Sequence, residues 1–321
     1  MRPARLRSLL VALLIVGVAV PVAHRAGATE ADEPRYVDWT SLLPGLVDTY
    51  DPGSSNDCVA GRVSCIAAAV KEMERRFVPL ADGCSHDAVF AMTYLRITQT
   101  YKWSVEQPGY YDDPRWMNHA VAVFAKYYLR AFDAWREGDP AAVPDAWRTA
   151  FGASGARRVS GSGNLMLGVN AHINRDLAFA MAAAGLAGED GSKKRNFDTV
   201  NRVLNSATLP LTAELAARFD PSMQDSGSPY HLDSVAIGNV MFGWREQAWR
   251  NAEALVAAPT ASVRATVSQQ IEANSVVQAQ AWLATSAYAP PLSSGASRDT
   301  WCAGHRWDRA PQAYPFGTPR R

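Results

Sequence analysis

The sequence predicts an all-α protein: one disulfide-stapled, multi-helix domain packed around a buried central helix at about residues 162–184. Three observations predict this fold. Apolar residues recur at helical spacing along most of the chain, and no run alternates cleanly enough for a strand. Residues 162–184 are apolar on nearly all sides, which is typical of a helix enclosed by others. The four cysteines form an even set, as expected for a framework of two disulfides.

Helix start and stop signals mark the ends of several of these helices. Asp113-Pro114 places an acid near the N-cap and proline at an early helical position, and Gly138 ends the same helix. Pro290-Pro291 ends the last long helix, and the tail beyond it is expected to be irregular. Together with the periodicity, these signals predict helices at about residues 64–79, 86–104, 114–137, 143–152, 162–184, 195–205, 210–219, 230–257 and 261–287.

The N-terminus has the pattern of a signal peptide. Three arginines precede an apolar run over residues 9–20, and Ala26-Gly27-Ala28 provides a small-x-small cleavage site. The run is shorter than the ~20 residues that span a bilayer, so cleavage after Ala28 is favoured over an uncleaved anchor. The protein is therefore expected to be secreted. The resulting division is signal peptide 1–28, irregular N-terminal segment 29–57, helical domain 58–289 and irregular C-terminal tail 290–321.

The charge balance and the hydropathy pattern exclude some classes of binding partner. Removing residues 1–28 takes away four arginines and no acid, so the formal net charge falls from +1 to −3. A mildly acidic chain has no basic footprint for nucleic acid. No later segment is long and apolar enough to form a stable membrane span. A small-molecule or lipid ligand is compatible with this composition, whereas protein partners and oligomeric state are not indicated.

Four cysteines allow three pairings, and the sequence favours one of them. Cys58 and Cys65 would close a short loop before a helix. Cys84 and Cys302 would then attach the C-terminal tail to the helical domain. A metal site is a weaker interpretation, because the four residues contain no CxxC spacing.

The segment NAHINRDLAFAM, residues 170–181, carries several polar side chains inside the otherwise apolar central helix. His172 and Asp176 are four residues apart and lie on one side of the helix, while Asn170 and Asn174 form a second such pair on roughly the opposite side. A buried polar group without a partner costs about 1–3 kcal/mol, and a buried carboxylate costs more. These side chains therefore need partners, or a functional site must explain them.

Arg245 is the best candidate partner, because it points into the apolar stripe of helix 230–257 and a buried arginine needs an acid. Asp176 or Asp198 could supply that acid, and Arg96 is a second candidate donor. Two other histidines are expected to be solvated or to cap a helix. His119 falls opposite the apolar stripe of its helix, and His86 lies at a helix start, where capping or surface exposure is common.

Two explanations of the polar segment remain open. In the first, these side chains form a network that specifies helix packing and does no chemistry. In the second, the HxxxD pair His172 and Asp176 holds one zinc or another divalent metal from adjacent helical turns, with Asp198 and His231 as further ligands. Asn174 and Arg245 would then orient the ligands or bind a substrate anion, as catalytic residues.

Several stretches resemble a known family. The stretches are NLMLGVNAHINRDLAFAM (164–181), YLRITQTY (94–101), DPRW (113–116) and FDTVNRVL (197–204). Together they are similar to an all-helical actinobacterial family known only as a domain of unknown function, DUF5995, and the similarity spans roughly residues 85–257. Its most specific element is AHINxDL. The resemblance implies that His172, Asn174 and Asp176, with Asp198 as a further candidate, belong to the family's site; it implies no reaction.

Two functions follow as hypotheses. The leading one is an exported metal-dependent hydrolase, in which the metal lowers the pKa of a bound water to ~7 and polarises an ester or phosphoester. The alternative is a non-catalytic protein that binds a lipid or another small molecule between its helices, with the buried polar network at the floor of the pocket.

Overall fold

The computed structural model describes residues 46–186, 191–224 and 232–319, and every regular element in these ranges is a helix. The expected signal peptide lies outside the described residues. The prediction of an all-α fold is confirmed. The elements in chain order are α1 (Val63–Asp82), α2 (Ala88–Val105), α3 (Pro114–Arg136), η1 (Pro140–Ala142), α4 (Asp145–Gly155), α5 (Gly161–Val169), η2 (Asn170–Asp176), α6 (Leu177–Ala184), α7 (Ser192–Arg218), η3 (Pro221–Met223), α8 (Leu232–Ala257), α9 (Ala261–Thr285) and α10 (Gly295–His305).

Side-chain caps explain where several helices begin. The Asp113 carboxylate accepts a hydrogen bond from the Trp116 backbone N–H at 3.0 Å, and Pro114 takes the first position of α3, as its sequence signals predict. The Ser160 hydroxyl caps α5 by accepting from the Gly163 N–H. These caps satisfy backbone donors that have no partner inside the helix.

Two expectations about the helices are wrong. Residues 192–218 form one continuous helix, α7, with Pro210 inside it, rather than two helices separated near residue 206. Burial of the neighbouring Leu211 and Leu215 side chains holds this helix against the core despite the missing proline N–H. The tail expected to be irregular contains α10, which begins with a capping box formed by Ser294 and Ser297.

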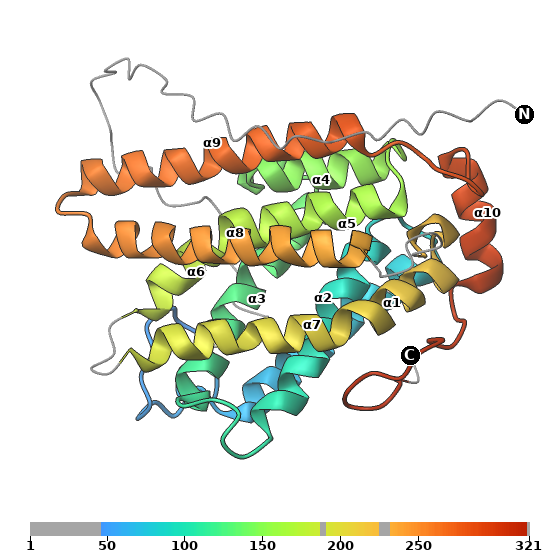
Figure 1. The fold of residues 1–321 in the computed structure, drawn as a ribbon. Coiled ribbons are helices and arrows are strands. Elements are labelled where there is room, and N and C mark those ends of the chain that lie inside the picture. Colours follow the sequence, from blue (N-terminus) through green and yellow to red (C-terminus); the bar gives the residue numbers. More distant parts are fainter. Residues whose placement is uncertain (1–45, 187–190, 225–231, 320–321) are drawn as a thin grey trace, which may run out of the picture. The chain divides into compact units, whose positions relative to one another are not determined.

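The central helix of the prediction is an almost continuous rod made of α5, η2 and α6, and other helices enclose it (Figure 1). The η2 segment contacts α3, α4, α8 and α9, and α6 packs against α3 and α8. Helices α8 and α9 run side by side. Among the described helices, none combines the length and the apolar character of a membrane span. The polar side chains of η2 thus lie where the surrounding helices meet.

Both predicted disulfides are confirmed: Cys58 is bonded to Cys65 and Cys84 to Cys302. The first closes the loop that precedes α1. This loop folds over α3 and buries His119 completely, so the expectation of a solvated His119 is wrong. Its two ring nitrogens lie 3.0 Å from the Cys58 carbonyl oxygen and 2.6 Å from that of Asp48. Projection of α3 alone could not show the loop that covers its polar side.

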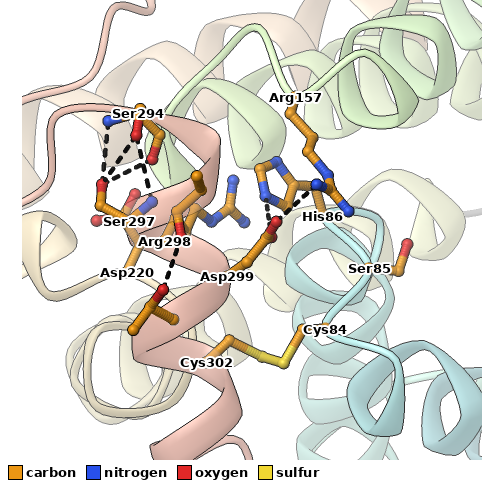
Figure 2. Close-up of polar contacts among 12 residues, drawn as sticks. Cys84, Ser85, His86, Arg157, Asp220, Ser294, Ser297, Arg298, Asp299 and Cys302 are labelled. Carbon is orange, nitrogen blue, oxygen red and sulfur yellow. Dashed lines mark hydrogen bonds and ion pairs between the residues drawn. A yellow bond between two sulfur atoms is a disulfide. The ribbon is translucent and has the colours of Figure 1, made fainter.

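The second disulfide anchors α10 beside the start of α2 (Figure 2). Asp299 of α10 lies between His86 and Arg157, with an Oδ1 atom 3.1 Å from His86 Nε2 and an Oδ2 atom 2.9 Å from the Arg157 guanidinium (Figure 2). His86 is only 4% exposed, so the expectation of a surface histidine is wrong. Helix α10, which the sequence did not predict, is the element that covers it.

The buried His86 is expected to make stability fall in acid. Burial, with repulsion from Arg298 and Arg157, lowers the pKa of His86 to about 3, whereas an unfolded histidine titrates near its usual value of about 6.5. Between these two pKa values the unfolded chain binds more protons, so the contribution of His86 is fully present above pH ~6.5 and is lost as the pH falls toward 3. Between pH 7 and 4.5, the free energy of unfolding measured in urea should fall by about 2 kcal/mol less in His86→Gln than in the wild type.

The neighbouring Asp87 affects the pH dependence of stability in the opposite direction, so the experiment needs a control for it. Burial raises the pKa of Asp87 to about 6, so the folded state binds the extra proton between pH ~6 and ~4. Comparing His86→Gln with the wild type cancels this contribution. A His305→Gln variant, which alters a partly exposed histidine of α10, controls for the loss of any histidine. Equal acid sensitivity of wild type and His86→Gln would contradict the prediction.

A buried ion cluster joins α2, α7 and the C-terminal tail. Glu214 accepts hydrogen bonds from Arg96 Nε at 2.9 Å and Nη2 at 2.8 Å, from Arg218 Nη1 at 2.7 Å and from the Tyr314 hydroxyl at 2.7 Å. Burial alone would raise the pKa of Glu214, but the contacts with Arg96, Tyr314 and Arg218 hold it below its usual value. Arg96 was a candidate donor to the central polar segment; its partner is instead Glu214.

Candidate functional site

The polar segment of the central helix is a π-helix, η2, and is completely enclosed by protein. All seven residues of Asn170–Asp176 are at most 8% exposed. In a π-helix the backbone hydrogen bonds skip one more residue than in an α-helix, which changes the register of the side chains. Such segments occur frequently at functional sites. Gly168, just before η2, permits a close approach of α2, since a Cβ at this position would lie 2.4 Å from the Phe90 ring.

Asp176 is the polar centre of this segment, and its arginine partner is Arg175. The Asp176 carboxylate accepts hydrogen bonds from Trp147 Nε1 at 2.8 Å and from Arg175 Nη1. Arg175 in turn pairs with Glu272 of α9 through Nε at 2.7 Å and Nη2 at 2.6 Å. Of the two acids expected for Arg245, Asp176 or Asp198, Asp176 is therefore not its partner. Adjacent residues of a regular helix do not face each other, so helical projection could not identify Arg175.

His172 is held as a neutral imidazole. Burial lowers its pKa below the usual value, and the neighbouring Asp176 only partly opposes this shift. Its Nδ1 atom lies 3.3 Å from Asp176 Oδ2 and donates to it, because a neutral ring with a carboxylate beside Nδ1 places the proton there. The Phe124 ring stacks on the imidazole at 3.6 Å between centroids. Within the described residues, Nε2 has no hydrogen-bond partner.

The two asparagines form a packing contact between helices. Asn174 Nδ2 donates to Asn170 Oδ1 at 3.0 Å, and Asn170 Nδ2 donates to the Ser275 carbonyl oxygen of α9 at 2.8 Å. This is the bridging role of the structural explanation. Asn174 does not line the cavity beside the polar segment, so no contact in the structure supports its predicted role in catalysis.

The structure brings together only part of the predicted metal site. His172 and Asp176 are in contact, as their spacing predicts. Asp198 lies on α7 with 48% of its side chain exposed and pairs with Lys194 at 2.6 Å, so it is not a neighbour of the buried pair. His231 lies outside the described residues. In the chain that the structure describes, no group of three or more histidine, cysteine, aspartate or glutamate side chains could hold a metal.

Arg245 of α8 is buried next to the central helix at 5% exposure. Its Nε donates to Asn201 Oδ1 at 2.8 Å and its Nη2 to the Phe197 carbonyl oxygen at 2.6 Å. Its guanidinium carbon lies 4.2 Å from the centroid of the Phe197 ring. Burial lowers the pKa of Arg245 to about 10, against the attraction of Asp198, so it stays a cation at neutral pH.

A cavity of about 270 Å³ lies between these groups. Apolar side chains from α2, α3, α5, α6, α7 and α8 form most of its wall, including Phe90, Phe124 and Met181. His172, Tyr94 and Arg245 contribute polar groups. A pocket between the helices was the alternative hypothesis, but its lining could not be located from the sequence, because an internal volume depends on how helices pack. The helix face that carries Tyr94, Thr98 and Tyr101 was a signal in the sequence, and all three residues line the cavity.

The comparisons with known proteins identify a family without a described function. The model of a family of unknown function, DUF5995, matches residues 66–285, which is more than half of the chain. Neither a curated protein nor a solved structure matches this chain significantly. The family match covers α2 to α9, with η2 and the cavity, and most of α1. On this match, the chain belongs to the family of unknown function DUF5995.

Proposed function

We propose that this protein binds a small apolar molecule in the cavity between its helices, and that it does so without a metal. The cavity itself is the observation that supports this function. Its wall is mainly apolar, with a few polar groups that could orient a ligand, which is the usual composition of small-molecule sites. A cavity of about 150 Å³ accommodates benzene, so about 270 Å³ corresponds to a ligand of roughly ten non-hydrogen atoms.

The size of the cavity supports a ligand-binding role rather than a packing defect. Native protein interiors contain few voids larger than a water molecule. The cavity is partly open to solvent, so a ligand that enters it displaces water from a mainly apolar wall, which is favourable.

The hydrolase hypothesis instead assigns His172 and Asp176 to a metal site. It requires His172 and Asp176 to share a metal, but Asp176 already accepts from Trp147 and Arg175. The structural network therefore uses the carboxylate that the metal would need. Elemental analysis of the protein, purified without chelator, separates the two functions. One equivalent of a transition metal, lost in His172→Ala, would support the hydrolase and contradict the binding function in the form proposed here.

Filling the cavity tests the proposed function directly. Ala120 of α3 lines the cavity, so Ala120→Leu places additional carbon atoms there. We expect this substitution to raise the free energy of unfolding of the ligand-free protein by up to about 2 kcal/mol, because it buries apolar atoms where space exists. The same change should weaken binding of 1-nonanol at least tenfold, because the ligand and the leucine compete for one volume. Urea unfolding and titration calorimetry measure the two effects.

Ala122→Leu is the matched control on the same helix. Ala122 is completely buried but packs beside the Cys58–Cys65 disulfide, away from the cavity. We expect it to destabilise the protein by about 1–3 kcal/mol, as overpacking does elsewhere, and to leave binding of 1-nonanol unchanged. Equal destabilisation by both substitutions would show that no usable cavity exists.

We further propose that the protein acts outside the cytosol. Two disulfides stabilise the helical domain, and disulfides persist mainly in oxidising compartments. The N-terminal sequence pattern supports secretion through a cleaved signal peptide. N-terminal sequencing of the mature protein tests this proposal, with Thr29 as the expected first residue.

A further inference from the structure

Arg245 differs from Arg96 and Arg175, two other buried arginines, in how its charge is balanced. Arg96 has a bidentate ion pair with Glu214, and Arg175 pairs with both Asp176 and Glu272. Arg245 has only the neutral acceptors Asn201 and Phe197. Within the part of the chain that the structure describes, no carboxylate forms an ion pair with Arg245.

The remaining candidate acid, Asp198, does not neutralise this cation. Asp198 attracts Arg245 through space, but its own carboxylate is 48% exposed and bound to Lys194. A buried cation without a paired anion is costly, because burial removes its hydration. The hydrogen bonds of Nε and Nη2 leave donors on Nη1 of the guanidinium, which has five N–H donors in total.

The same arginine belongs to the wall of the cavity, whose other polar groups carry no full charge. His172 is neutral there, and Tyr94 is a phenol whose pKa burial raises well above its usual value. Among the described residues of the wall, Arg245 is therefore the one cation that a ligand meets, beside neutral hydroxyl, phenol, amide and imidazole groups. Arginine guanidinium groups bind carboxylates through charge-assisted hydrogen bonds, and these are about twice as strong as neutral ones.

We propose that Arg245 binds the end group of the ligand, and that the ligand is a monocarboxylate with an apolar body of about the size of a medium-chain fatty acid. This inference rests on the proposed binding function and adds the ligand's charge and chemical class. A single guanidinium suits one carboxylate, and the volume limits the ligand to roughly ten non-hydrogen atoms. The carboxylate would supply the counter-ion that the described residues do not.

Three ligands of equal heavy-atom count test the charge without changing the size: octanoate, 1-nonanol and nonylamine. Titration calorimetry of the purified protein at pH 7.4 measures their affinities. We expect octanoate to bind at least tenfold more tightly than 1-nonanol, because a charged hydrogen bond contributes about 1.5–3 kcal/mol. The nonylammonium cation should bind more weakly than 1-nonanol. Octanoate binding no tighter than 1-nonanol would overturn the proposal, and no binding of any of the three would overturn the binding function itself.

Substitution of Arg245 then assigns the preference to one side chain. In Arg245→Met the preference for octanoate should disappear, while binding of 1-nonanol should persist or improve. Arg245→Lys, which keeps a charge, should retain part of the preference and serves if the methionine variant does not fold. Arg250→Gln is the matched control, since Arg250 lies on the same helix with 66% of its side chain exposed. Retention of the full preference in Arg245→Met, or its loss in Arg250→Gln, would overturn the assignment.

Discussion

Replacing Asp176 with alanine is expected to destabilise the protein by about 3–5 kcal/mol, because it removes one partner from a buried ion pair. The substitution would remove one of the two carboxylates that pair with Arg175, and the Trp147 indole N–H would lose its Asp176 acceptor. His172 would lose the contact that orients its proton toward Nδ1. Asp176→Asn should be less severe, because an amide oxygen can still accept from Trp147. Urea unfolding of the purified variants measures the differences.

Asp198→Ala is the control for this experiment, because sequence analysis placed Asp198 and Asp176 in the same metal site. Asp198 is half exposed and pairs with Lys194 on the surface, so its loss should change the stability little. A shared metal would instead make both substitutions release the ion. Similar large effects of the two substitutions, together with loss of a bound metal, would contradict the structural role assigned here to Asp176.

Glu214→Ala should have an effect at least as large, about 3–5 kcal/mol, because one carboxylate balances two buried arginines. Arg96 is completely buried and Arg218 is 1% exposed, so neither could recover its hydration without moving. The Tyr314 hydroxyl would lose its acceptor as well, which should loosen the C-terminal tail from α7. Urea unfolding measures the stability, and hydrogen exchange of residues near Tyr314 reports on the tail.

Two further variants decide whether charge is the cause. Glu214→Gln keeps the shape but removes the charge and one of the two acceptor oxygens, so a loss close to that of alanine would show that a neutral amide cannot replace the carboxylate. Glu246→Ala removes an exposed glutamate that pairs with Lys194 and Arg250, and it should have little effect. A loss below about 1 kcal/mol in Glu214→Ala would show that the buried arginines find other partners.

Most of the fold could be predicted from the sequence, because helix formation and burial depend on local spacing. The faces of α3 and the ends of most helices follow from apolar periodicity and from caps such as Asp113. Two errors share one cause. The continuity of α7 through Pro210 and the formation of α10 both depend on packing against distant segments, which local signals do not contain. His86 and His119 were misplaced for the same reason, since distant segments bury them.

The position of the candidate site could be predicted from the sequence, but most of its contacts could not. The polar letters of residues 170–181 identified the right helix, and the contact of His172 with Asp176 follows from their spacing. The π-helical register, the pairing of Asp176 with Arg175 and the cavity could not be predicted in the same way. Each of them depends on three-dimensional packing or on a departure from regular α-helical geometry, and a projection at 3.6 residues per turn assumes that none occurs.

The disulfide between Cys84 and Cys302 also determines the order in which the chain can mature. Cys58 and Cys65 are seven positions apart and can join as soon as both reach an oxidising compartment, whereas Cys84 must wait for a partner 218 positions further on. Until Cys302 arrives, Cys84 is a thiol close in sequence to another cysteine pair. Correct pairing requires either early closure of the local loop or later thiol–disulfide exchange. Oxidation is complete only once Cys302 has joined Cys84.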